Sequence, residues 1–152
     1  MKVAFITRHT PSNYGSVLQT FATQKAIEAL GHEAVCINYI RTDELPENQA
    51  KTPLAVSRWN KNAATRLLYK VTQKPVFDAA TKRFDVYRSN MLKLTDEVWN
   101  TPEQLAENLP EADIYMTGSD QVWNTVGTGV IDHAYFLSFV PEDKKKIAYA
   151  CC

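Results

Sequence analysis

The pattern of apolar and polar residues predicts short buried strands separated by helices. Residues 3–7 (VAFIT) form an apolar, β-rich run bounded by the turn-forming residues TPSNYG, and residues 34–39 form a second run of this kind. Between the two runs, residues 16–30 have the period of an amphipathic helix, and Gly31 stands where a left-handed residue ends a helix. The first forty residues therefore predict a parallel, right-handed β–α–β unit.

The predicted helix over residues 16–30 has one apolar face, which we expect to be buried. Ile27 points away from this face and has no explanation in the pattern. The face consists of Leu18, Phe21, Ala22, Ala26, Ala29 and Leu30.

The middle of the chain predicts an excursion beside the sheet. Residues 42–62 are polar and include two prolines, which favours a loop followed by a weak helix. Residues 63–71 and 76–92 have helical spacing and are separated by a break at Pro75. In the second of these segments, the aromatic residues on one face are Phe77, Phe84 and Tyr87.

The last third of the chain returns to the sheet. Thr101 is a predicted helix N-cap, and the strands predicted after it lie at residues 113–117 (DIYMT) and 145–150 (KKIAYA). The order of elements predicts an α/β fold with a mainly parallel sheet. Ligands of such sheets bind at the carboxyl ends of the strands, where residues 8–16 and 118–124 form polar loops.

Composition and charge place the chain among soluble globular domains. Its 152 residues are 45% hydrophobic, and 17 basic side chains balance 17 acidic ones without a long block of either sign. This balance gives no electrostatic footprint for nucleic acid or an anionic membrane. The sequence has no signal-peptide core and no run that could span a bilayer, so we expect a cytoplasmic protein.

The cysteines indicate neither a disulfide framework nor a metal site. Cys36 lies in an apolar run and is expected to be a buried small hydrophobe, while Cys151 and Cys152 are adjacent. The chain stops at these two residues directly after a strand, with no cap or polar tail. We therefore expect a single domain over residues 1–152 of a longer protein.

The first polar loop lacks the glycine fingerprints of dinucleotide and nucleoside-triphosphate sites. It retains Asn13, Tyr14 and Gly15 before the predicted helix, where free backbone amides could receive an anion. An alternative is that Asn13 or Ser16 only caps the helix. His9, in the same loop, is a candidate for proton transfer near neutral pH.

The second polar loop, GSDQVWN, offers hydrogen-bonding groups of the kind that orient sugar hydroxyls. Asp120 is a candidate general base, and Trp123 either packs against a sugar ring or fills the core. The competing interpretation is a turn in which Ser119 or Asp120 holds backbone amides. The remaining candidate binding residues here are Gly118, Ser119, Gln121 and Asn124.

Four stretches, in this order and at these separations, together resemble the polysaccharide pyruvyl transferase family. They are TRHTPSNYGSVLQTFATQKAIEALGHE, ADIYMTGSDQVWN, YFLSFV and KKIAYA. The resemblance spans nearly the whole chain, is strongest over residues 9–19 and 118–124, and is weak over residues 43–94. One departure is Cys151-Cys152, because family members often have small or hydroxyl residues after the final strand.

The resemblance implies an enzyme that transfers the pyruvyl group of phosphoenolpyruvate to a glycan or lipid-linked sugar as a ketal and releases phosphate. It implies no cofactor beyond this donor substrate. It also implies two Rossmann-like domains of the GT-B type, of which this chain is the N-terminal, acceptor-side half, inactive alone, with the donor-binding domain following it. The full-length protein would act in bacterial exopolysaccharide biosynthesis. The resemblance is compatible with peripheral membrane association of that protein.

Two other functions stay open from the sequence. A GT-B-like glycosyltransferase that uses a nucleotide sugar would share the two-domain fold. A non-catalytic sugar-binding or interaction module could use the same scaffold, because a fold does not fix a function.

Overall fold

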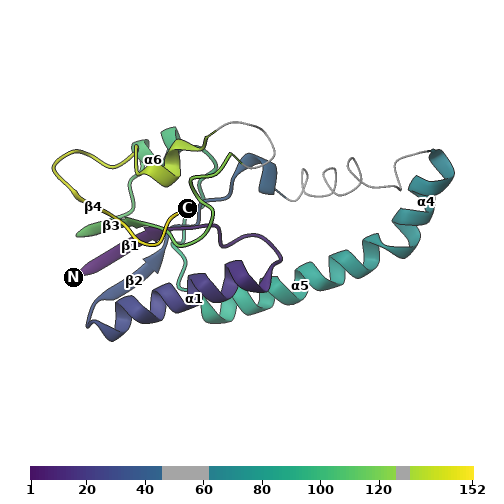
Figure 1. Cartoon of the computed structure of the whole chain (residues 1–152), viewed down its shortest axis with the longest axis horizontal. Coiled ribbons are helices and arrows are strands. Elements are labelled where there is room, and N and C mark those ends of the chain that lie inside the picture. Colours follow the sequence, from purple (N-terminus) through teal and green to yellow (C-terminus); the bar gives the residue numbers. More distant parts are fainter. Residues whose placement is uncertain (46–61, 126–130) are drawn as a thin grey trace.

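A four-stranded, fully parallel sheet forms the centre of the computed structural model, which describes residues 1–45, 62–125 and 131–152. The strand order is β2-β1-β3-β4, so the chain moves to one side of β1 first and to the other side later (Figure 1). The strands are β1 (Lys2–Ile6), β2 (Glu33–Cys36), β3 (Ile114–Thr117) and β4 (Lys145–Ala148). The predicted α/β, Rossmann-like fold is confirmed.

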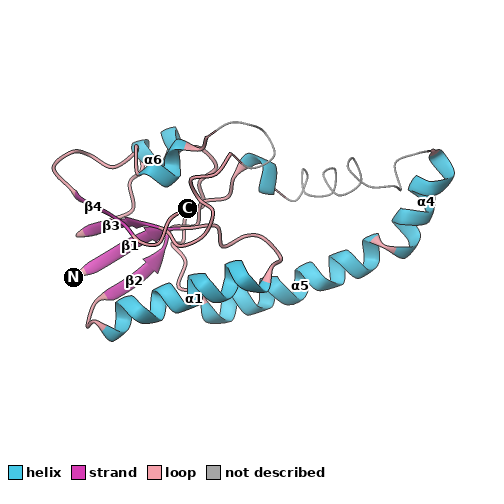
Figure 2. Ribbon diagram, viewed as in Figure 1, coloured by secondary structure: helices cyan, strands magenta, loops and turns pink. Residues whose placement is uncertain are grey.

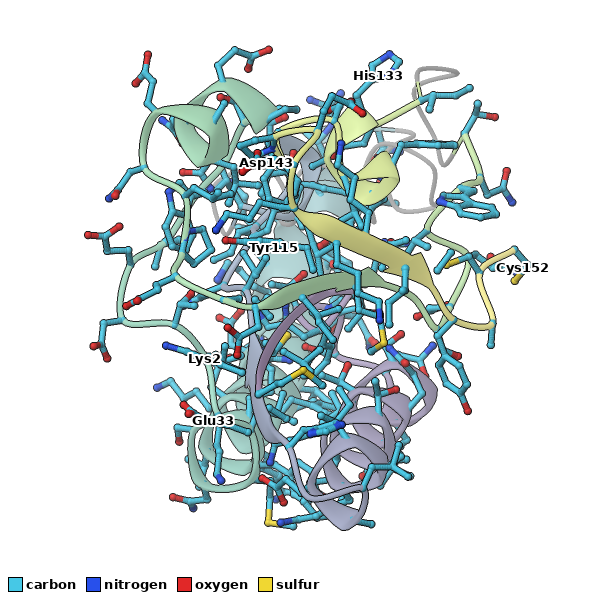
Figure 3. All side chains as sticks on the ribbon, turned by 90° about the vertical axis from the view of Figure 1, so that its left-hand side faces the viewer. Lys2, Glu33, Tyr115, His133, Asp143 and Cys152 are labelled. Atoms are coloured by element: carbon cyan, nitrogen blue, oxygen red, sulfur yellow. The ribbon has the colours of Figure 1, made fainter. Side chains whose placement is uncertain are left out.

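Helices cover both faces of the sheet, which gives three layers (Figure 2). Helices α1 (Tyr14–Ala29) and α5 (Lys74–Met91) lie on one side. On the other side lie α6 (Pro102–Glu107) and the short 3₁₀ helix η3 (His133–Phe136). Figure 3 views these layers end on, with Glu33 toward α1 and α5 and Tyr115 toward α6.

Alternate residues of each strand fill two separate cores, as the two-residue period of a strand requires. Val3 and Phe5 of β1 pack with Ile27 of α1 on one side of the sheet. Ala4 and Ile6 pack on the other side in a larger cluster that includes Leu105 of α6 and Tyr135 of η3. The buried Cys36 belongs to the first core, as the sequence predicted.

The predicted helix caps are confirmed, with small shifts at the element ends. Asn13 caps α1 by accepting a hydrogen bond from the Gly15 amide at 2.7 Å, and Gly31 follows α1 with φ of 79°. Thr101 caps α6 by accepting from the Gln104 amide at 3.3 Å. Each cap satisfies an amide that the first turn of a helix leaves unpaired.

The predicted buried face of the first helix is wrong. Leu18 and Leu30 are exposed, whereas Ile27, which the pattern left unexplained, packs in the core. The buried positions of α1 are Ser16, Val17, Thr20, Thr23, Gln24 and Ile27. This face is mostly polar because its polar side chains have partners there: Gln24, for example, donates to the Met91 carbonyl at 3.3 Å and accepts from the Lys93 amide at 2.7 Å.

The middle of the chain forms the predicted excursion, which projects away from the sheet (Figure 1). The helices are α4 (Ala63–Thr72) and α5, and they meet at Gln73 rather than at Pro75, because proline is tolerated in the first turn of a helix. Before them, η1 (Thr42–Glu44) is a single 3₁₀ turn. Residues 46–61 of the predicted loop and weak helix lie outside the described residues.

None of the helices within the described residues is long and apolar enough to cross a membrane.

Candidate functional site

The polar loops that the sequence singled out meet at the topological switch point of the sheet. β1 connects to β2 on one side, and β3 connects to β4 on the other, so the chain diverges between the carboxyl ends of β1 and β3. Open α/β sheets bind their ligands in the crevice at this point. A hydrogen bond joins the two loops here, from the Thr7 hydroxyl to the Ser119 carbonyl oxygen at 2.7 Å.

Asp120 follows β3 at this switch point and faces the first turn of α1. The Ser16 hydroxyl donates to Oδ2 of Asp120 at 3.0 Å, and the Gln121 amide donates to Oδ1 at 2.7 Å. The side chain is partly exposed. Because each carboxylate oxygen has two lone pairs, Asp120 can accept further hydrogen bonds from a ligand.

Gly118 lets the loop after β3 pass close to the segment after β4. Its φ of 117° lies in a region that favours glycine, and a Cβ built there would stand 1.9 Å from the Tyr149 carbonyl oxygen. Two residues later, Asp120 pairs with Cys151 in a parallel bridge, and the Cys152 amide donates to the Asp120 carbonyl at 3.3 Å. The ends of three strands therefore meet around Asp120.

Gln19 of α1 links the residue after β1 to α1 by hydrogen bonds. Its Nε2 donates to the hydroxyl oxygens of Thr7 at 2.9 Å and Thr20 at 3.1 Å. Its Oε1 is buried and has no hydrogen-bond partner among the described residues. Sequence reasoning gave no site role to Thr7 or Gln19 and considered Ser16 only as a cap. Their positions were the signal in the sequence. Thr7 directly follows β1, and Ser16 and Gln19 lie in the first turns of the helix that begins at the sheet edge.

Asn13, Tyr14 and Gly15 lie at the start of α1, and the helix-cap interpretation of Asn13 is confirmed. Tyr14 is 75% exposed, and its ring centroid lies 4.8 Å from that of Phe84 on α5. Tyr14 is one wall of a largely apolar groove of about 360 Å³ between α1 and α5. The loop therefore offers a capped helix start and an exposed aromatic ring.

The second loop presents Trp123 at the surface, beside η3. Its indole N–H donates to the Tyr135 carbonyl at 3.0 Å, and its ring stacks on Phe136 with centroids 5.4 Å apart. These contacts fix the ring while 38% of the residue stays exposed. Gln121 and Asn124 are exposed on either side of it.

His9 contacts Asn38, which follows β2, and it is one of the residues around a cavity. It is 2% exposed and lines a cavity of about 290 Å³ together with Asn38, Glu44 and Arg88, among others. Its Nε2 lies 3.2 Å from Asn38 Oδ1, and its Nδ1 lies 3.4 Å from the Thr7 carbonyl oxygen. Burial lowers the pKa of His9, which favours the neutral imidazole.

Within the described ranges, no hydrogen bond joins His9 to Asp120. The two candidate catalytic residues therefore do not form one hydrogen-bonded dyad.

Two cations near these loops are paired with carboxylates among the described residues. Nε of Arg8 donates to Glu44 at 2.8 Å, and Arg88 pairs with Asp85. The described residues contain no group of three or more His, Cys, Asp or Glu side chains that could hold a metal ion.

Comparison with known proteins identified one family. The family model described as polysaccharide pyruvyl transferase matches residues 13–152. The match includes Asn13, Tyr14, Gly15 and the whole second loop, whereas His9 and β1 precede it. Comparisons with curated proteins and with solved structures found no match.

Proposed function

The chain belongs to the polysaccharide pyruvyl transferase family, and on this basis we propose that it helps to transfer the pyruvyl group of phosphoenolpyruvate to a sugar as a ketal. The product carries a carboxylate, and inorganic phosphate is released. We assign the chain to the N-terminal, acceptor-side domain of a two-domain enzyme of the GT-B type.

The observation that carries this assignment is the position of Asp120. It follows the strand next to the switch point, and its carboxylate is held by the Ser16 hydroxyl at 3.0 Å with part of its surface open. A carboxylate that is fixed but accessible can accept the proton of a sugar hydroxyl as that hydroxyl attacks. The exposed amides of Gln121 and Asn124 lie in the same loop and can orient the sugar.

The reaction needs two such attacks. A general acid protonates the methylene carbon of phosphoenolpyruvate, which leaves an oxocarbenium-like centre at the carbon that bears the phosphate. The first sugar hydroxyl forms a C–O bond there and loses its proton to a base. The bond to phosphate then breaks, and the second hydroxyl attacks the same carbon and loses its own proton. Of the two protons released, one balances the methylene protonation and one leaves with phosphate or solvent.

In this proposal Asp120 accepts the proton of one attacking hydroxyl. His9 is the second candidate acceptor, because burial keeps its imidazole neutral and the cavity beside it contains polar groups. We assign sugar binding to six further residues of the two loops: Asn13, Tyr14, Gly15, Gly118, Ser119 and Trp123. The charged groups of phosphoenolpyruvate need cations. On the family resemblance, we assign donor binding to the other domain.

The test is phosphate release from phosphoenolpyruvate with a panel of sugar acceptors. We expect acceptor-dependent release from the longer protein in which this chain forms the first domain, and none from the 152-residue chain alone. Turnover of a nucleotide sugar without phosphate release from phosphoenolpyruvate would replace the proposal with a glycosyltransferase. Sugar binding by the chain alone, with neither activity in the longer protein, would replace it with a binding module.

A further inference from the structure

Helix α4 has an amphipathic surface that nothing in the described structure covers. All ten of its residues are exposed or partly exposed, and none is buried. Leu67, Leu68 and Val71 are 64%, 50% and 67% exposed, and with Ala64 they follow the i, i+3, i+4, i+7 spacing of one helix face. We call these four residues the α4 apolar face.

Helix α4 has a capping box at its start and continues into α5 at its end. Asn62 and Thr65 form a reciprocal capping box: the Asn62 side chain accepts from the Thr65 amide at 2.9 Å, and the Thr65 hydroxyl oxygen accepts from the Asn62 amide at 3.2 Å. The helix continues through Gln73 into α5, which carries it away from the sheet (Figure 1). The apolar face thus lies at the far end of a projecting arm.

The helix that carries this face is basic, although the whole chain is neutral. Helix α4 contains Arg66 and Lys70 and no acidic residue. Over residues 62–84 there are five basic side chains and one acidic side chain, Asp78, so the arm is positive while the rest of the chain compensates for it. The five basic residues are Arg66, Lys70, Lys74, Lys82 and Arg83.

We propose that α4 binds the surface of an anionic lipid bilayer, lying in the interface with its apolar face toward the acyl chains. A helix with leucine and valine on one side and basic residues elsewhere on its surface fits such a bilayer. When the apolar side is buried among the acyl chains, the basic side chains lie close to the anionic headgroups, which neutralise their charge. A second copy of the chain fits less well. A two-fold dimer through this face would bring together two copies of a segment that has five basic side chains and one acidic side chain over residues 62–84.

The experiment is flotation of the full chain with vesicles of phosphatidylglycerol mixed with phosphatidylcholine, or of phosphatidylcholine alone. We expect binding to the mixed vesicles that weakens as salt is added, and much less binding to the neutral ones. Replacing Arg66 and Lys70 with Gln should lower binding to the mixed vesicles by about fivefold for each charge removed.

The triple variant Leu67→Asn/Leu68→Asn/Val71→Asn should lose vesicle binding and keep the thermal unfolding of the wild type, because these side chains are already exposed. The matched control is Val98→Asn, an apolar residue that is 51% exposed and lies outside the arm, and it should bind like the wild type. Failure of the wild-type chain to bind mixed vesicles, or unchanged binding by the triple variant, would overturn the proposal.

Light scattering without vesicles distinguishes the other occupant. A wild-type dimer that becomes a monomer in the triple variant, with no vesicle binding by either, would assign the α4 apolar face to a second copy. The inference does not rest on pyruvyl transfer, so either proposal can fail while the other stands.

Discussion

Gly118 is the residue at which the site geometry depends most directly on the absence of a side chain. Alanine there would place Cβ 1.9 Å from the Tyr149 backbone oxygen, at a φ of 117°. We expect Gly118→Ala to lower the free energy of unfolding by at least about 3 kcal/mol, because strain and a backbone clash add. Urea denaturation measures this change.

Gly31→Ala is the matched control for Gly118→Ala. Gly31 also has a positive φ, of 79°, but a Cβ there would meet nothing within 4 Å. Its substitution should therefore cost only about 1 kcal/mol, the conformational penalty alone. Equal costs at the two positions would show that the chain after β4 does not press against Gly118.

His9 should make stability depend on pH. Burial, with a further contribution from the nearby Arg88 charge, lowers its pKa below the ordinary value of 6.5, while the Asn38 and Thr7 contacts and the Glu44 charge oppose this shift. The unfolded chain therefore binds the proton more tightly than the folded one. Stability from keeping His9 neutral is fully present above pH 6.5 and is lost as pH falls through the lowered folded pKa.

His9→Gln removes this titration. We expect the unfolding free energy of the wild type to fall more steeply than that of the variant as pH decreases below 6.5, as measured by denaturation at a series of pH values. Parallel curves for the two proteins would mean that His9 is not desolvated as the structure shows.

At the scale of elements, α1 shows which side of a helix carries its stability. Ile27→Ala should cost about 2–4 kcal/mol because it opens a cavity in the core between α1 and the sheet. Leu18→Ala should change stability by less than about 1 kcal/mol, because Leu18 is 51% exposed and borders only the groove between α1 and α5. The reverse order, measured by chemical denaturation, would restore the face that the apolar pattern predicted.

The strands could be predicted from the sequence because the inner strands of a parallel sheet are buried on both faces and read as continuous apolar runs. Val3 to Ile6 illustrate this, since all four are buried. The buried face of α1 could not be predicted, because Thr20 and Gln24 are buried with hydrogen-bond partners: Thr20 donates to the Ser16 carbonyl at 2.7 Å, and Gln24 bonds the chain after α5. An apolar pattern does not register polar groups that are buried together with their hydrogen-bond partners.

The candidate site was predictable in position and not in its contacts. The carboxyl ends of parallel strands meet at one edge of the sheet. The sequence therefore predicted that the loops of Asn13 and Asp120 would both lie at this edge. The contact of Asp120 with Ser16 links residues 104 positions apart, and it depends on how α1 lies across the sheet. The contact of His9 with Asn38, which follows β2, is likewise one that no local pattern encodes.

At the scale of the whole molecule, the switch point and the arm are separate features of one chain. The switch point brings together the polar loops after β1 and β3 and the segment after β4, and α5 carries α4 away from the body (Figure 1). This separation lets chemistry at the crevice and attachment through α4 be tested by independent substitutions.

The most direct test of the central claim is the rate of acceptor-dependent phosphate release from phosphoenolpyruvate by the Asp120→Asn variant of the proposed two-domain protein. Asn keeps the size of the side chain, and its oxygen can still accept one of the two hydrogen bonds that Ser16 and Gln121 donate to Asp120. Its amide cannot accept a proton as a carboxylate does. We expect kcat to fall by about 10²–10⁴-fold.

The control for Asp120→Asn is Asp113→Asn. Asp113 is a carboxylate at the opposite end of the same strand, where it accepts a hydrogen bond from the Lys2 amide at 2.7 Å, and its substitution should leave kcat unchanged. A kcat equal to that of the wild type in a folded Asp120→Asn protein would contradict the assignment of Asp120 as the base.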